Sequence, residues 1–94
     1  MEIGQLEAFE RVARDGSFTR AAVALGLTQP AVSTRITTLE AELGGTLFER
    51  RGKTLKLTPL GVYFLPYTRR LLAVRDDART GIEQFHSGKL GEVR

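Results

Sequence analysis

Residues 18–43 read FTRAAVALGLTQPAVSTRITTLEAEL, and the order of small, apolar and capping residues in this stretch is that of a helix-turn-helix. A short helix is expected to begin near Phe18, and Gly26 supplies the left-handed backbone conformation that ends it. Thr28 is placed to cap a second helix, and Ala22 leaves room where the two helices cross steeply. The stretch therefore predicts two helices, of which the second is the one that reads DNA in such motifs.

The second helix has one apolar stripe and one face of short side chains. The stripe repeats at steps of 4 and 3 and consists of Val32, Ile36, Leu39 and Leu43. The opposite face carries Pro30, Ser33, Thr34, Thr37, Thr38 and Ala41. Short side chains let a helix backbone approach a groove floor, where hydroxyl groups bond to bases or phosphates. The alternative is a face exposed only to water, but Lys or Glu would suit that role better than these weak helix formers.

Four further residues of this helix are assigned by chemistry. Gln29 carries an amide that can pair with both hydrogen-bonding groups of adenine, and its alternative role is a solvated residue of the first turn. Arg35 flanks the face of short side chains and is expected to reach a phosphate. Glu40 and Glu42 lie near the other end and are expected to face protein or water, because DNA would repel them.

Helical and hairpin patterns surround the helix-turn-helix. Apolar residues on one side predict a first helix over residues 3–14. Residues 47–57, LFERRGKTLKL, alternate apolar and charged residues around Arg51-Gly52, which predicts a two-stranded hairpin, or wing. Arg51 and Lys53 are expected at its tip, where they can follow a DNA backbone or enter the minor groove. Arg50 and Lys56 have an equal claim to be ordinary strand-face charges.

A long helix is expected to begin at Thr58-Pro59 and to continue to Ser87. At about 1.5 Å per residue it would extend roughly 40 Å, more than the body of so small a domain can cover. Its apolar residues repeat at steps of 4 and 3, and the repeat consists of Leu60, Phe64, Tyr67, Leu71, Val74, Ala78, Gly81 and Phe85. Because no other surface in the chain is expected to cover this seam, we predict a homodimer.

Composition and charge limit the functions that remain. The 94 residues suffice for one small domain, 41% of them are hydrophobic, and the net charge is +3. The basic surplus lies after residue 28, since residues 1–28 carry three basic and four acidic side chains. The chain has no Cys, which excludes disulfides and thiolate metal sites. No long apolar run and no signal peptide are visible, so we expect a cytoplasmic protein with no membrane partner.

An enzyme is the first rival class of function. The only histidine is His86, which has no ligand-like or catalytic neighbours in the sequence. Asp76 and Asp77 are adjacent and would point about 100° apart on a helix, unlike a facing acid–base pair. No phosphate loop or metal-ligand spacing occurs. We therefore expect no catalytic residues, no cofactor and no metal. Two more rivals are a dimerisation module that contacts only protein and a DNA binder without sequence preference.

At these residues the chain resembles the amino-terminal part of LysR-type transcriptional regulators. The resemblance covers about residues 3–94, and the Gln-Pro that follows the turn and the Leu-Phe-x-Arg before the wing are specific to that pattern. It implies a mainly α-helical winged helix-turn-helix, of three helices and a two-stranded wing, followed by a long helix that pairs antiparallel with a second subunit. The DNA contacts that follow from the residues and the resemblance are Gln29, Pro30, Ser33, Thr34, Arg35, Thr38, Arg51 and Lys53. One departure is Thr34, where many members have a basic residue.

The resemblance also implies how the chain is divided. We expect a DNA-binding domain over residues 1–58, a dimerising linker helix over residues 59–87, and the start of a further linker over residues 88–94. The final KLGEVR resembles the first strand of the family's larger effector-binding domain, which senses a small molecule. The chain is thus expected to be the DNA-binding part of a longer regulator, or alternatively a natural short form. Its DNA target is expected to be an interrupted palindrome bound by a homodimer.

Overall fold

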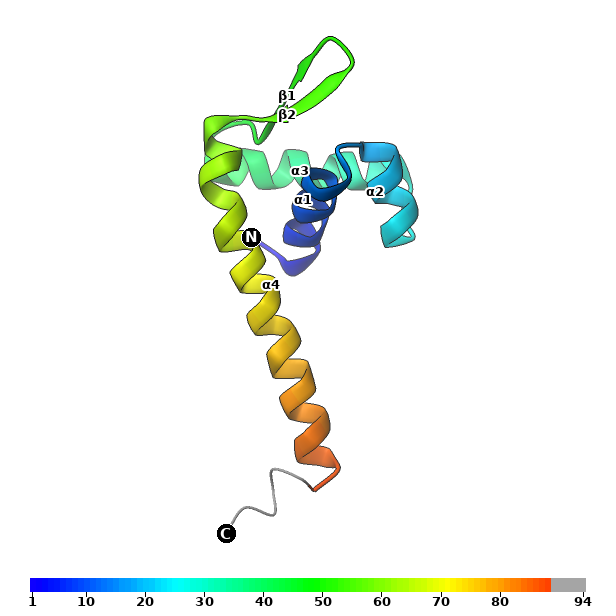
Figure 1. The fold of residues 1–94 in the computed structure, drawn as a ribbon, viewed down its shortest axis with the longest axis vertical. Helices are drawn as coiled ribbons and strands as arrows, with labels where there is room; N and C mark the ends of the chain where they lie inside the picture. Colours follow the sequence, from blue (N-terminus) through cyan, green and yellow to red (C-terminus); the bar gives the residue numbers. More distant parts are fainter. Residues whose placement is uncertain (89–94) are drawn as a thin grey trace.

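A compact body and a projecting helix make up the fold, which a computed structural model describes for residues 1–88 (Figure 1). The elements in chain order are α1 (Ile3–Asp15), α2 (Phe18–Leu25), α3 (Gln29–Leu43), β1 (Phe48–Arg51), β2 (Thr54–Leu57) and α4 (Pro59–His86). The two strands form one antiparallel hairpin in which Phe48 pairs with Leu57 and Arg51 with Thr54. This arrangement confirms the predicted winged helix-turn-helix with a long helix after it.

Hydroxyl side chains begin three of the helices. The hydroxyl oxygens of Ser17, Thr28 and Thr58 each accept a hydrogen bond from the backbone N–H three residues further on, at 3.1, 3.2 and 3.1 Å. The first helix of the motif ends at Gly26, whose φ of 67° is left-handed, as predicted. Local sequence therefore sets both ends of the turn that separates α2 from α3.

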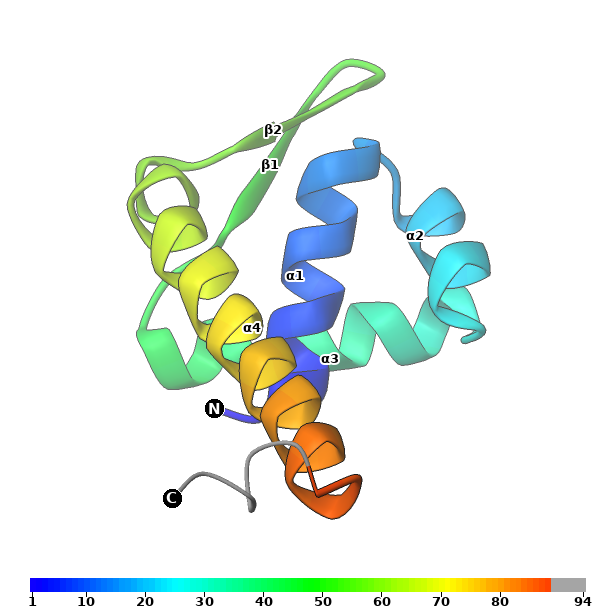
Figure 2. The ribbon, with the colours of Figure 1, turned by 60° about the horizontal axis from the view of Figure 1, so that its bottom comes forward.

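Helix α1 is the centre of the core. It lies between α2 and α4 and crosses α3 (Figure 2). The ring of Phe9 is fully buried, stacks on Phe64 of α4 at 5.8 Å and meets the edge of Phe48 of the wing at 5.5 Å. On its other side α1 packs with Ala21, Ala22 and the apolar stripe of α3. One aromatic residue thus joins the wing and α4 to the helical body.

Element boundaries differ from the sequence predictions by one residue in two places. Helix α1 includes Asp15, which was expected to lie in the break after it. The turn of the wing consists of Gly52 and Lys53, whereas the sequence pattern centred it on Arg51-Gly52. The shift places Lys53 in the turn itself and Arg51 at the last pair of the ladder. Helix α4 continues without a break through Pro66.

The seam predicted for α4 needs a correction at its start. Leu60 and Phe64 were expected to be uncovered, but both pack against the core cluster formed by Leu6, Phe9, Leu39 and Leu47. The reason is that the first half of α4 lies against α1, so one of its apolar faces is used within the chain. Beyond the body the helix runs on alone, and the longest dimension of the molecule is 59 Å (Figure 1). No helix within residues 1–88 is both long and apolar enough to cross a membrane.

Candidate nucleic-acid interface

Helix α3 presents the face of short side chains that its sequence predicts. The buried residues of this helix are Val32, Ile36 and Leu39, and Leu43 packs at the edge of the core. The exposed residues on the opposite side are Gln29, Pro30, Thr34, Thr37, Thr38 and Ala41, while Ser33 is half-buried. No acidic or long side chain interrupts this set. A groove floor can therefore come close to the backbone of α3 along its exposed side.

Gln29 is oriented by a residue that the sequence analysis did not single out. The hydroxyl of Thr19, on α2, donates a hydrogen bond to the amide oxygen of Gln29 at 3.3 Å. A carbonyl oxygen has two lone pairs, so this contact leaves one of them and both N–H donors of the amide available. Gln29 thus keeps the donor and the acceptor that pairing with adenine requires.

Arg35 lies elsewhere than predicted. Its Nη1 donates to the backbone oxygen of Gly4 at 3.4 Å, which ties the half-buried side chain to the start of α1. A Cβ at Gly4 would come 2.8 Å from Nη1, so the glycine leaves room for the guanidinium. Because Arg35 is about 100° around the helix from Thr34, it points to the flank that meets α1. The structure does not bring it to the exposed face.

Both glutamates of α3 are occupied by protein contacts, as expected. The carboxylate of Glu40 accepts a hydrogen bond from the Leu47 N–H at 2.7 Å, which joins α3 to the approach to the wing. Glu42 pairs with the amino group of Met1 at 2.7 Å. Neither carboxylate is free to repel an anion bound at the exposed face.

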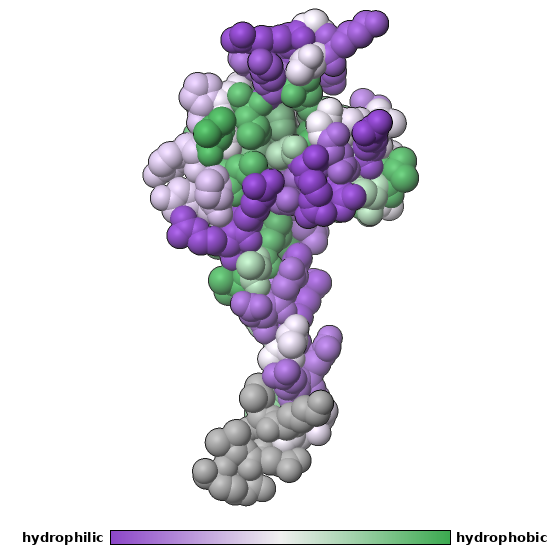
Figure 3. Space-filling model, viewed as in Figure 1, coloured by the Kyte–Doolittle hydropathy of each residue, from purple (hydrophilic) through white to green (hydrophobic). Residues whose placement is uncertain are grey.

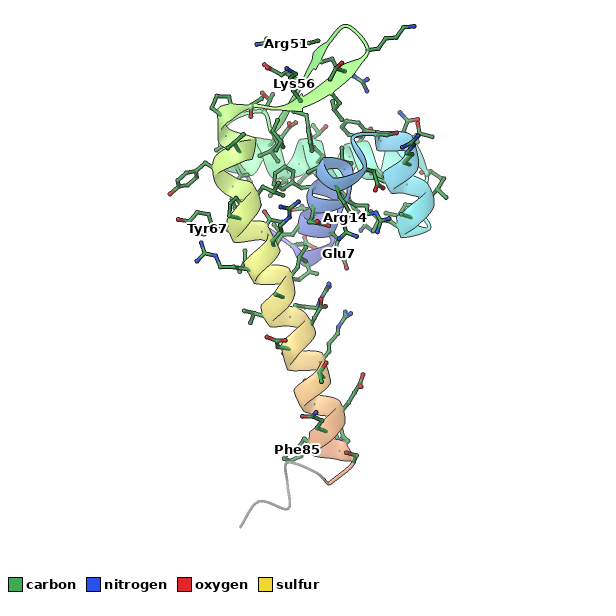
Figure 4. The ribbon with its side chains drawn as sticks, in the orientation of Figure 1. Glu7, Arg14, Arg51, Lys56, Tyr67 and Phe85 are labelled. Atoms are coloured by element: carbon green, nitrogen blue, oxygen red, sulfur yellow. The ribbon has the colours of Figure 1, made fainter. Side chains whose placement is uncertain are left out.

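The wing carries its cations in two directions. Arg51 and Lys53 are exposed at the tip, and Arg51 pairs with Glu49 at 3.3 Å. Lys53 forms no ion pair within the described residues 1–88. Arg50 faces the body instead, with its guanidinium carbon 5.7 Å from the centre of the Phe18 ring. Figure 4 shows Arg51 and Lys56 on the wing, and hydrophilic side chains cover this end of the molecule in Figure 3.

Two open hollows separate the wing from the helix-turn-helix. One, of about 440 Å³, is lined by residues that include Arg20, Arg50, Lys53 and Gln29. The other, of about 240 Å³, lies between α3 and the wing, and Arg50 borders it too. Arg20 and Arg50 are therefore candidate contacts that the sequence analysis did not assign. Their signal was weak, because a basic residue early in a helix or on a strand is ordinarily a solvated charge.

Helix α4 carries a second exposed surface, which is apolar. We define the outer stripe as the exposed residues on one side of α4, namely Tyr63, Tyr67, Leu71, Val74, Ala78, Ile82 and Phe85. Tyr63 and Ile82 take the places that the sequence pattern gave to Phe64 and Gly81. The guanidinium of Arg70 lies 4.6 Å from the centre of the Tyr67 ring. Figure 4 shows Tyr67 projecting away from the body.

Comparison with known proteins gives consistent matches. Residues 3–62 match the family described as bacterial regulatory helix-turn-helix protein, lysR family. The chain is 41% identical over 93 residues to an uncharacterised HTH-type transcriptional regulator of Azotobacter vinelandii, covering 99% of the chain and 65% of that protein. It is 42% identical over 90 residues to the HTH-type transcriptional regulator CbbR of Rhodospirillum rubrum, covering 96% of the chain and 30% of that protein.

A solved structure extends the comparison to three dimensions. The crystal structure of the BenM_DBD/catB site 1 DNA complex is similar to the chain with a TM-score of 0.87 and 39% identity, covering 94% of this chain and 99% of that one. The chain thus spans the whole of that chain, but less than two thirds of the Azotobacter protein and under a third of CbbR.

Proposed function

The chain belongs to the lysR family of bacterial regulatory helix-turn-helix proteins, and on that premise we propose that it binds double-stranded DNA in a sequence-specific manner as part of a transcriptional regulator. The observation that carries the proposal is the exposed face of α3, which is free of acidic and long side chains and lies beside the basic hollows of the wing. In this proposal α3 enters the major groove and the wing lies at the minor groove. The role is binding and not catalysis.

The residues divide into base and backbone contacts. Gln29, Pro30 and Ser33 lie at the start of α3 and are proposed to meet bases, with Thr34 and Thr38 at bases or backbone. Arg51 and Lys53 of the wing are proposed to lie at the minor groove. Arg20 and Arg50 line the hollows between these two regions and are added as phosphate contacts. Arg35 is left out, because its guanidinium is bonded to Gly4.

We further propose that the outer stripe of α4 is covered by α4 of a second copy of the chain. Its positions recur every eleven residues, as from Tyr63 to Val74, and such a repeat runs almost straight along an α-helix. Together with the half-buried Leu60, the steps between stripe residues are 3, 4, 4, 3, 4, 4 and 3, which read the same from either end. Two antiparallel copies therefore match each other, with Leu71 opposite Val74 at the two-fold axis.

The same register gives every bulky stripe residue a partner. In it Tyr63 lies opposite Ile82, and the large Tyr67 lies opposite the small Ala78. A two-fold dimer carries two α3 helices and so fits an interrupted palindrome. A small-molecule effector would be bound only by a longer parent protein. Because bacterial DNA lies in the cytoplasm, the proposal places the protein there.

Selection from a pool of random duplexes tests the proposed function. Enrichment of one interrupted palindrome is expected, and it would report binding, stoichiometry and register together. Recovery of no common sequence would contradict sequence-specific binding, and complex formation insensitive to added salt would contradict binding through phosphate contacts.

Gln29→Ala is expected to relax discrimination at one base pair of each half-site. The expected loss is about 1 to 3 kcal/mol if the amide pairs with both groups of adenine, with almost unchanged affinity for random DNA. Titration on the selected duplex, on single-base variants and on random DNA measures it. Gln84→Ala makes the same change near the far end of α4 and should have no effect. Equal losses on all duplexes would reassign Gln29 to positioning.

Lys53→Ala is expected to weaken specific and random DNA alike. A cation in the minor groove senses potential and groove width more than base identity. The slope of log affinity against log salt should fall by about 1. Lys56→Ala removes an equal charge from the strand face opposite Glu49 and is the matched control. An unchanged slope and affinity in Lys53→Ala would mean that the wing tip points into solvent.

A further inference from the structure

Two ion pairs join α4 to the body. The carboxylate of Glu10, on α1, is nine-tenths buried and binds Arg69 of α4 at 3.5 Å as well as Arg14 of its own helix at 2.7 Å. One turn earlier on α1, the carboxylate of Glu7 accepts a hydrogen bond from Arg75 of α4 at 3.0 Å. Figure 4 shows Glu7 on α1 where this helix passes α4.

Arg75 lies where α4 leaves the body. Its side chain is only 18% exposed, and Leu72, one turn before it, is the last apolar residue of α4 that packs against the core. No hydrogen bond or ion pair described for residues 1–88 joins a later residue of α4 to the body. The hydrogen bond from Arg75 to Glu7, followed by that to Asp76, raises the pKa of the Arg75 guanidinium. The outermost tie is thus a fully charged one.

An open hollow lies beside these ion pairs. It has a volume of about 420 Å³, and Glu7, Arg69, Ala73 and Arg75 are among its lining residues. Because side chains do not fill it, α4 has room to tilt on this side if the ion pairs are broken. The Phe9–Phe64 stack lies deeper and would keep the first half of α4 on the body. The ion pairs are placed to limit the direction of α4 more than its attachment.

We propose that the Glu7–Arg75 pair, supported by Glu10–Arg69, fixes the angle between α4 and the body and thereby sets the spacing of the two DNA half-sites that a dimer recognises. The inference rests on the proposed function. In the antiparallel register the two-fold axis passes between Leu71 and Val74, next to Arg75, so a small tilt at this residue moves the whole body relative to its partner. Two tilts add in a symmetric dimer. Glu7 and Arg75 are positioning residues, since neither lies at the exposed face of α3.

Affinity for duplexes that differ only in spacer length tests the inference. The selected half-site is placed at its preferred spacing and at spacings one and two base pairs longer or shorter. Glu7→Ala is expected to lower affinity at the preferred spacing by about two- to fivefold, the range of a partly exposed ion pair, and to lower the penalty at neighbouring spacings. Glu42→Ala, which removes an equal charge whose partner is Met1, should keep the wild-type profile. Melting temperature and sedimentation confirm that both variants fold and dimerise.

A second measurement follows the angle without DNA. The chain has no Cys, so Val23→Cys, at a residue 79% exposed on α2, allows one spin label per subunit. Glu7→Ala is expected to broaden the label-to-label distance distribution of the dimer. An unchanged distribution together with an unchanged shape of the spacing profile would overturn the inference, as would an equal loss at every spacing. Failure of the unaltered chain to bind any selected sequence would instead overturn the proposed function.

Discussion

Leu71→Arg is expected to convert the proposed dimer into a monomer. Leu71 is 43% exposed and belongs to neither core cluster, so its replacement should leave the fold of the body intact. In the antiparallel register it lies opposite Val74 beside the two-fold axis, so each dimer would bring two guanidinium groups together in the middle of an apolar seam. Juxtaposed like charges cost several kcal/mol, and we expect the dimer dissociation constant to rise at least about 100-fold.

Sedimentation at micromolar concentration measures this effect. Thr80→Arg adds the same side chain to an exposed position of α4 outside the outer stripe and should remain dimeric. Binding to a palindromic duplex should weaken by about 100-fold or more in Leu71→Arg, because the second half-site is no longer bound intramolecularly. Binding to a single half-site should change little. A dimeric Leu71→Arg variant, or an unaltered chain that is monomeric at micromolar concentration, would contradict the proposed dimer.

Elements whose ends are set by neighbouring residues could be predicted from the sequence. Thr28 and Thr58 cap the N–H groups three residues further on, and Gly26 takes the left-handed conformation, so α2, α3 and the start of α4 lie where the sequence puts them. The exposed face of α3 follows from the same periodicity. The wing turn differed by one residue, because the charged run around it offers no apolar residue to fix the register.

The use of α4 could not be read from spacing alone. Its first half has two apolar faces about 100° apart, one with Phe64 and one with Tyr63, and both fit steps of 3 and 4. Only the contact of Phe64 with Phe9 shows which face is inward. Arg35 likewise finds Gly4 31 positions away. Partners that far apart in the chain leave no local pattern.

Gly61 is a further residue whose role only the structure reveals. It lies in the first turn of α4, is fully enclosed, and donates its N–H to the cap hydroxyl of Thr58. A Cβ at this position would collide with the backbone oxygen of Leu47 and lie 2.9 Å from Leu57 Cδ2. The Leu47 peptide cannot give way easily, because its oxygen binds the Thr58 N–H at 3.0 Å and its N–H binds Glu40. The glycine thus permits α4 to start against the segment that leads into the wing.

Gly61→Ala is therefore expected to destabilise the fold by about 3 kcal/mol or more, as overpacking against a fixed backbone does. Gly81→Ala provides the matched control on the same helix, because a Cβ there meets nothing within 4 Å. Alanine favours a helix over glycine, so that variant should instead gain about 0.5 to 1 kcal/mol. Denaturant unfolding of both variants measures the difference. Equal stability of Gly61→Ala and the unaltered chain would mean that α4 can shift away from Leu47, and the angle between α4 and the body would then not be fixed by this contact.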